Sequence, residues 1–290
     1  MNLGLVCMRK CRGFKKGFSG IKALQKASNT QVRSKLSEAS IYNLKETISN
    51  IQYCIDNNIY AYRASSNVIP FYEFWDWESN DEILRLMWYI TKLSYNNNIV
   101  LTIHPDQFTV LCSPKQDVVD SSIQILSHHY KLAEYMGIKH IILHVGGVYN
   151  NKDQAMTRFI DNFMLLPELV QKLIRLENCH SYDIDDVLLI SDICGVDVCF
   201  DFHHQRVIHG DVSVTNYLDI MKRVVEQNKC VTITHISSGK SCPSDKSHAD
   251  FISVADINLF SSVLSHFMSV ITEVEAKNKE QAIYKIGILL

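Results

Sequence analysis

The chain has 290 residues, of which 47% are hydrophobic and 21% are charged, and its formal net charge is −2. These values are typical of a globular protein and exclude the disordered, collagen-like and membrane classes. Because the overall charge gives no general attraction for nucleic acid, a DNA-binding surface would need local clusters of lysine and arginine. At this length we expect a single domain covering residues 1–290.

The cysteines and the apolar segments indicate a cellular compartment. The nine cysteines are scattered and form no CxxC pair, which is typical of reduced thiols in an intracellular protein. We find no apolar stretch long enough for a secretion signal, and none with the ~20 apolar residues of a membrane span. We therefore expect a cytoplasmic or nuclear monomer with no membrane partner.

Strands and helices are predicted to alternate along the chain. Short segments rich in β-branched residues predict eight strands, at residues 2–7, 59–66, 98–105, 140–147, 173–179, 197–204, 231–238 and 269–277. Apolar residues at helical spacing predict helices at residues 42–57, 81–96, 116–136, 154–172, 212–228 and 254–267. This alternation favours parallel strands with helical crossovers, and eight repeats fit a closed (β/α)8 TIM barrel.

An open doubly wound sheet is the alternative architecture. It is weakened by the turn after the first strand, where Cys7-Met8-Arg9-Lys10 stands in place of a glycine-rich phosphate-binding turn.

Polar side chains lie near the carboxyl ends of six predicted strands. They are His104, His144, Glu177, Asp201 with His204, His235, and Glu273 with Glu275. In a TIM barrel these ends converge on one face, where active sites are built from several strands. Neighbouring carboxylates need cations to offset their repulsion, so the pattern predicts a multinuclear metal site.

The donor types narrow the choice of metal without settling it. Nitrogen and oxygen donors without thiolates suit manganese, zinc or iron better than calcium. His248, in the loop after the seventh strand, is a natural further ligand, whereas Asp250 is interpreted as a helix cap. Glu273 and Glu275 share one face of the last strand, and their spacing does not choose between them. Six further histidines have no comparable placement and are interpreted as solvated or structural: His128, His129, His140, His180, His203 and His209.

Seven short motifs, in order along nearly the whole chain, resemble those of ultraviolet-damage endonucleases. They are Arg63-Ala64-Ser65-Ser66, His104-Pro105-Asp106-Gln107-Phe108, His144-Val145-Gly146-Gly147, Leu176-Glu177-Asn178, Asp201-Phe202-His203-His204, His235-Ile236-Ser237-Ser238 and Glu275-Ala276-Lys277. A more distant similarity to endonuclease IV covers the same metal positions.

The resemblance implies a metal-ligand set and a catalytic group. His104 and His144 would hold one metal, Glu177 would bridge it to a second, and His204 with His248 would hold a third. The second metal would be completed by Asp201, His235 and Glu275, and it is the resemblance that selects Glu275 over Glu273. The implied catalytic residues are His104, His144 and Glu177. Two to three divalent ions are expected, with manganese favoured and zinc as the alternative, and no nucleotide cofactor.

The same resemblance implies double-stranded DNA carrying UV lesions as the partner. The expected reaction is a nick immediately 5′ of a photoproduct, leaving a 3′ hydroxyl, with abasic sites as a further substrate. Gln107 and Phe108 resemble the family's lesion-probing pair, and they offer a ring to stack and an amide to bond to unpaired bases. Phosphate contacts are expected from the basic loop after the first strand, formed by Arg9, Lys10, Arg12, Lys15 and Lys16.

The sequence departs from the family pattern at three places. Ile233 stands where the family often has a lysine, a histidine usual after the first motif is replaced within residues 71–75, and Leu5 stands in place of a tyrosine. Two alternative functions remain open. One is a metal-dependent sugar isomerase or epimerase, whose barrel gathers the same ligand types, and the other is a catalytically impaired damage-binding protein.

Overall fold

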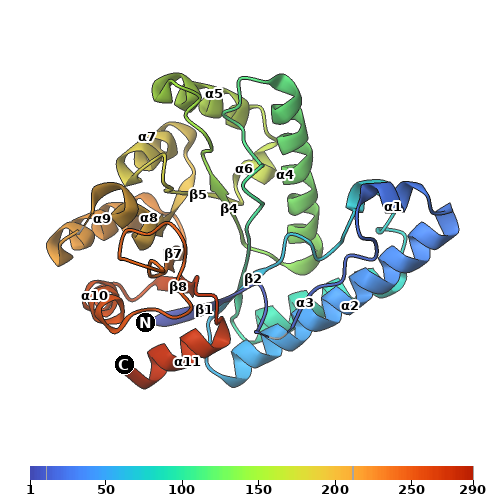
Figure 1. Ribbon diagram of the computed structural model, residues 1–290, viewed down its shortest axis with the longest axis horizontal. Coiled ribbons are helices and arrows are strands. Elements are labelled where there is room, and N and C mark those ends of the chain that lie inside the picture. Colours follow the sequence, from blue (N-terminus) through green and yellow to red (C-terminus); the bar gives the residue numbers. More distant parts are fainter. Residues whose placement is uncertain (11, 211, 290) are drawn as a thin grey trace.

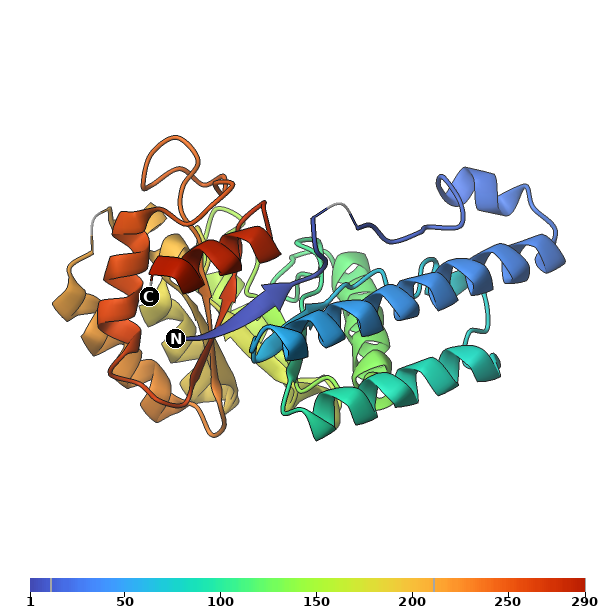
Figure 2. The same cartoon turned by 90° about the horizontal axis from the view of Figure 1, so that it is seen from below.

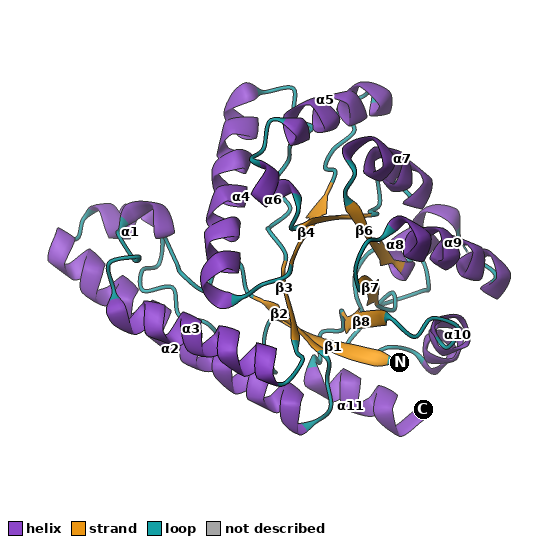
Figure 3. Ribbon diagram, turned by 180° about the vertical axis from the view of Figure 1, so that it is seen from behind, coloured by secondary structure: helices purple, strands orange, loops and turns teal. Residues whose placement is uncertain are grey.

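The chain folds into a closed barrel of eight parallel strands, which occur around the barrel in sequence order (Figures 1 and 3). The computed structural model describes residues 1–10, 12–210 and 212–289. The predicted (β/α)8 barrel is thus confirmed, and the open sheet is wrong. The strands are β1 (Asn2–Val6), β2 (Ala61–Ala64), β3 (Val100–Ile103), β4 (His140–His144), β5 (Ile174–Glu177), β6 (Asp197–Asp201), β7 (Thr232–Ile236) and β8 (Val270–Val274).

Helices surround the barrel on the outside (Figure 3). None of those in the described part of the chain combines the length and the apolar character that a membrane crossing needs. They are α1 (Ile21–Gln25), α2 (Asn29–Asp56), the 3-10 turn η1 (Tyr72–Phe74), α3 (Asp81–Asn96), α4 (Gln116–Met136), α5 (Lys152–Met164), α6 (Glu168–Gln171), α7 (Ile184–Cys194), α8 (Phe202–His209), α9 (Val214–Gln227), α10 (Val254–Leu264) and α11 (Glu280–Leu289).

Two helical predictions need correction, and each has a local cause. The helix predicted at 42–57 begins much earlier, at Asn29, because Ser28 and Gln31 form a reciprocal capping box at its start. The helix predicted at 154–172 is divided into α5 and α6. Pro167 precedes α6 and disfavours helical backbone at the residue before it, which accounts for the break.

The sixth strand is shorter than predicted, which changes the setting of His204. The strand predicted at 197–204 ends at Asp201, and α8 begins at the next residue. The Asp201 side chain accepts a hydrogen bond from the backbone N–H of His204 and so caps this helix. His204 therefore projects from the first turn of a helix rather than from a strand.

The barrel interior carries its own small apolar layer. Ala61, Ile142, Cys199, Ile233 and Ile271 are buried together inside the barrel. Alternate residues of a strand face the same side, so Ile233 lies one layer below His235 on β7. The isoleucine at this position is therefore part of the packed floor beneath the mouth of the barrel.

One part of the molecule extends away from the barrel. Figure 2 shows the chain leaving the tip of β1 and running outward to α1, above the long helix α2. Phe18, Leu24, Val32 and Leu36 form a separate small core here, and Phe71 and Trp75 pack against it. The segment 71–75 thus contributes to the packing of this extension.

Candidate metal centre

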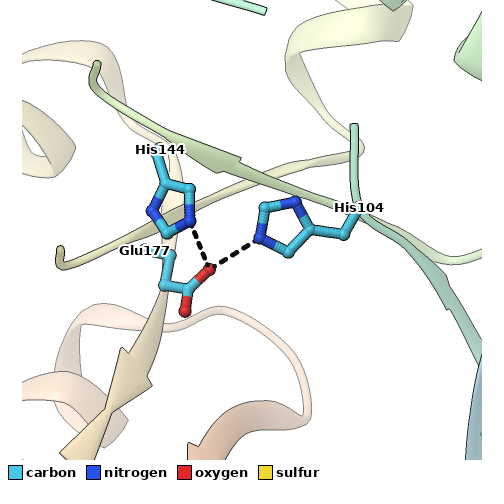
Figure 4. Close-up of side chains that lie close together, drawn as sticks. All are labelled: His104, His144 and Glu177. Carbon is cyan, nitrogen blue, oxygen red and sulfur yellow. Dashed lines mark hydrogen bonds and ion pairs between the residues drawn. The ribbon is translucent and has the colours of Figure 1, made fainter. Parts of the chain in front are cut away.

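Two histidine side chains, from the ends of β3 and β4, contact the Glu177 carboxylate at the mouth of the barrel. His104 follows β3, His144 ends β4 and Glu177 ends β5, so parallel pairing brings all three to the same rim. The Nε2 atoms of His104 and His144 lie 2.9 Å and 3.5 Å from Oε2 of Glu177. Figure 4 shows both rings directed at this carboxylate. One nitrogen from each ring and one carboxylate oxygen lie close enough together to bind one ion.

A second group uses the other oxygen of the same carboxylate. His235 Nδ1 lies 2.8 Å from Oε1 of Glu177, and Asp201 ends the intervening strand β6. Donor atoms of Glu177, Asp201 and His235 lie within 4.8 Å of one another, and all three residues are buried. Glu177 belongs to both groups, so this one carboxylate could contribute to two ion sites.

One carboxylate oxygen of Asp201 has no hydrogen bond among the described residues, although His204 Nδ1 lies 3.8 Å from it. Its backbone N–H donates to Asn178 Oδ1 at 2.7 Å, and its Oδ1 accepts from the N–H of His204 at 2.6 Å. Its Oδ2 is buried and has no hydrogen-bond partner among the described residues. Leaving a buried carboxylate oxygen unpaired is costly, so the donor set fits a cation at this point.

The two glutamates of the last strand take different places. Glu273 is fully buried beside Arg63, whose Nε donates to its Oε2 at 2.8 Å. Glu275, nearer the opening, lies 3.6 Å from His235 Nδ1 and 3.7 Å from His248 Nδ1 through its two oxygens. The Arg63 guanidinium also pairs with Glu275, so it bridges both carboxylates. Arg63 belongs to one of the seven motifs, but its position in the sequence does not indicate this central role.

The residues expected to hold a third ion are more dispersed. The ring centroids of His204 and His248 are 6.5 Å apart, and Nδ1 of His204 bonds to the carbonyl oxygen of Asn178 at 2.8 Å. His180 was interpreted as solvated or structural, yet its ring lies 4.6 Å from that of His204. His203 is buried and bonds to the Asp245 carbonyl oxygen.

Electrostatic coupling at the mouth shifts several ionisation equilibria. Burial would raise the pKa of Glu177, but the adjacent His235 and His144 outweigh it and hold that pKa well below its ordinary value. Burial dominates at Asp201 and raises its pKa. Burial also lowers the pKa of His144 to about 4. Glu177 is thus an anion and His144 a neutral imidazole near pH 7, which are the states that bind metals.

A cavity of about 900 Å³ opens directly beside the first ligand group. His104 and His144 line it together with Gln107, Phe108 and His180. A cavity of this volume is in the range that binds small organic ligands or an extruded base.

The loop that follows His104 presents its tip to solvent. Asp106 Oδ1 accepts a hydrogen bond from the Phe108 N–H at 2.9 Å, forming an Asx-type turn. Phe108 is 72% exposed, so it is not part of the core. Gln107 is exposed as well, and both side chains stand beside the cavity.

The basic loop after β1 divides into tethered and free side chains. Arg9 bonds to Ser49 and Asn50, and Lys10 Nζ bonds to Asn278 at 2.6 Å. Arg12 forms an ion pair with Glu46 at 2.9 Å. Lys15 and Lys16 are exposed and make no ion pair among the described residues. The ammonium group of Lys15 lies 4.2 Å from the ring centroid of Tyr42.

The protein is thus a (β/α)8 barrel that carries two overlapping groups of metal-binding side-chain types at the carboxyl ends of its strands. The sequence profile of the UV-endonuclease UvdE family matches residues 1–288. The chain belongs to this family, as its motifs suggested.

Individual relatives agree with this assignment. The chain is 29% identical over 274 residues to the UV DNA damage endonuclease of Bacillus velezensis, covering 90% of this chain and 84% of that protein. Among solved structures, it superposes on SacUVDE with a TM-score of 0.85 at 27% identity, covering 100% of this chain and 98% of the other. Endonuclease IV from Thermus thermophilus shares the fold, with a TM-score of 0.62 at 11% identity and coverages of 100% and 97%.

Proposed function

We propose that this protein is a metal-dependent DNA repair endonuclease that nicks double-stranded DNA immediately 5′ of UV photoproducts and leaves a 3′ hydroxyl. Abasic sites are its second proposed substrate. The observation that carries the proposal is the placement of Glu177 between two ligand groups beside an open cavity, in a member of the UvdE family. The protein is proposed to act as an intracellular monomer.

The ligand residues are proposed to hold two divalent ions, with manganese favoured over zinc. His104, His144 and Glu177 would bind the first ion, whereas Glu177, Asp201, His235 and Glu275 would surround the second. Such ions supply an activated water nucleophile and neutralise charge on the phosphate oxygens. A third ion at His204 and His248 would need these two side chains to approach each other more closely.

The side chains around the centre keep the ligands oriented. Nδ1 of His104 bonds to the carbonyl oxygen of Pro105 at 2.8 Å, which leaves Nε2 facing Glu177. Nδ1 of His204 bonds to the carbonyl oxygen of Asn178 in the same manner. Such outer hydrogen bonds fix the ring orientation of ligand histidines.

Damaged DNA would be recognised at the cavity and its exposed rim. A photoproduct stacks poorly and costs less to extrude than an intact dinucleotide, and the cavity would receive the extruded bases. Phe108 would then fill the gap in the stack and Gln107 would bond to the unpaired bases. Lys15 and Lys16 are the members of the basic loop most free to contact phosphates, since Arg9, Lys10 and Arg12 have protein partners.

A plasmid assay tests this proposal. Supercoiled plasmid, with and without ultraviolet irradiation, is incubated with the protein and manganese, and again with chelator. We expect relaxation of irradiated plasmid only when the metal is present. Absence of damage-dependent nicking with any divalent metal would overturn the proposal. Retention of irradiated DNA without cutting would favour a damage-binding protein, and turnover of a ketose without any nicking would favour the epimerase alternative.

A further inference from the structure

We infer that Glu273 is a positioning residue, which accepts a hydrogen bond from the Nε2–H of His235 and thereby turns Nδ1 of that ring toward the second ligand group. The inference rests on the proposed metal site. It gives a function to the glutamate that is not expected to be a ligand.

Both edges of the His235 ring face carboxylates. Nδ1 lies 2.8 Å from Glu177 Oε1, on the side of the ligand groups, and Nε2 lies 3.0 Å from Glu273 Oε2, on the side of the barrel interior. Arg63 Nη2 lies 3.4 Å from the same Nε2 atom, but a guanidinium cannot accept a hydrogen bond, so the acceptor for an Nε2–H is Glu273. His235 and Glu273 are register partners on the adjacent strands β7 and β8, and both are completely buried. The backbone pairing therefore sets the approach of the two side chains.

Glu273 is itself held in place by residues of three other strands. Arg63 Nε donates to its Oε2 at 2.8 Å, and the Thr102 hydroxyl donates to its Oε1. Gly4 on β1 leaves the necessary room, because a Cβ atom there would lie 3.0 Å from Glu273 Cγ. With both oxygens bonded inside the barrel, Glu273 is not free to swing outward and become a ligand.

This arrangement matches the outer-sphere pattern of metal sites. Histidines that bind metals commonly donate their second ring N–H to a carboxylate, which fixes the ring and makes it a stronger donor. Loss of such a partner typically lowers metal affinity by about 10- to 100-fold. Glu273→Met removes the acceptor while keeping a side chain of similar length, and Glu273→Gln keeps an acceptor but removes the charge.

Two measurements on the full-length protein test the inference without any DNA. The first is the affinity for Zn²⁺ by competition with a chromophoric chelator. We expect Glu273→Met to bind the ion of the second ligand group about 10- to 100-fold less tightly than the wild type. The affinity of Glu273→Gln should lie between those of this variant and the wild type. The second is the proton spectrum of the Zn²⁺-loaded protein, in which the His235 ring N–H should appear far downfield. His235→Asn identifies that signal by its loss.

The matched control is Asp197→Asn, which neutralises a buried carboxylate that pairs with Arg175 inside the same barrel. This variant should keep the wild-type affinity and the downfield signal. Unchanged affinity in folded Glu273→Met would overturn the inference. If Glu273→Met does not fold, an unshifted His235 N–H signal in Glu273→Gln would overturn it instead. A wild-type protein that binds Zn²⁺ and shows the signal, but never nicks DNA, would contradict the proposed function and leave this inference standing.

Discussion

The two ends of the barrel interior differ in their charge balance. At the mouth, four carboxylate side chains are buried or nearly so: Glu177, Asp201, Glu273 and Glu275. Among the described residues, the guanidinium that pairs with carboxylates of this group is that of Arg63. At the opposite end, one carboxylate faces one guanidinium: Asp197 pairs with Arg175 at 3.2 Å, and Cys230 bonds to both.

This difference in charge balance indicates which end of the barrel interior binds cations. A buried ion pair with one charge of each sign can be stable without further ions, whereas several carboxylates around one guanidinium repel each other unless histidines take up protons or cations bind. The end opposite the mouth is therefore expected to stabilise the fold. The carboxylates at the mouth are expected to bind metal ions. This division leads to different expected effects of substitutions at the two ends.

The largest effect is expected at the shared carboxylate. Glu177→Gln keeps the size of the side chain but removes the charge that serves both ligand groups. We expect nicking of irradiated plasmid to fall by about 10³-fold, because bound metals contribute several kcal/mol to the stability of the transition state. Initial nicking rates at saturating manganese measure this loss. A rate near wild type would remove Glu177 from the site.

The opposite end should respond in stability rather than in activity. Asp197→Asn leaves the buried guanidinium of Arg175 without its carboxylate partner. We expect the free energy of unfolding to fall by about 3 kcal/mol, as is usual when one member of a buried ion pair is removed. Urea unfolding at pH 7 measures it. The nicking rate of the folded protein should stay unchanged, and a parallel loss of activity would contradict the division.

The rim of the mouth should respond in activity without loss of stability. Phe108 is 72% exposed, so Phe108→Ala removes little buried surface and should leave the unfolding curve unchanged. We expect the rate on irradiated DNA to fall by about 10-fold, since stacking of an aromatic ring on a base contributes about 1–3 kcal/mol. The rate of Tyr149→Ala is measured for comparison, because Tyr149 is another aromatic residue that lines the cavity. An unfolding midpoint lowered by Phe108→Ala would indicate a packing role instead.

Buried histidines outside the site should make the fold sensitive to acid. Burial lowers the pKa of His128 to about 3, of His129 to about 4 and of His140 to about 3, whereas an unfolded histidine has a value of 6.5. Below pH 6.5 the unfolded state binds more protons at these positions, so the folded state loses stability as the pH falls toward 4. Each contributes up to about 1.4 kcal/mol per pH unit.

Urea unfolding between pH 7 and 4.5 measures this slope. His128→Asn should reduce it by about 1 kcal/mol per pH unit, because one such group is removed. The same slope in the variant and the wild type would show that His128 does not contribute to the acid sensitivity.

The sequence predicted the barrel because its strands and helices have distinct apolar periods, and it predicted the rim residues because parallel strands place their ends together. It could not predict where β6 ends, because the choice between strand and helix after Asp201 depends on a cap formed by its own side chain. It also could not assign Arg63 or Glu273. Their roles depend on contacts between β2, β7 and β8, which are far apart in the sequence. The approach of His180 to His204 likewise depends on the packing of loops.

Calorimetric titration of manganese, without DNA, into the wild-type protein, Glu177→Gln and Asp197→Asn tests the metal centre directly. The two substitutions change a buried carboxylate to an amide at opposite ends of the same barrel. We predict at least two bound ions in the wild type and in Asp197→Asn, and loss of tight binding in Glu177→Gln. Equal binding by Glu177→Gln and the wild type would contradict a metal centre organised around Glu177.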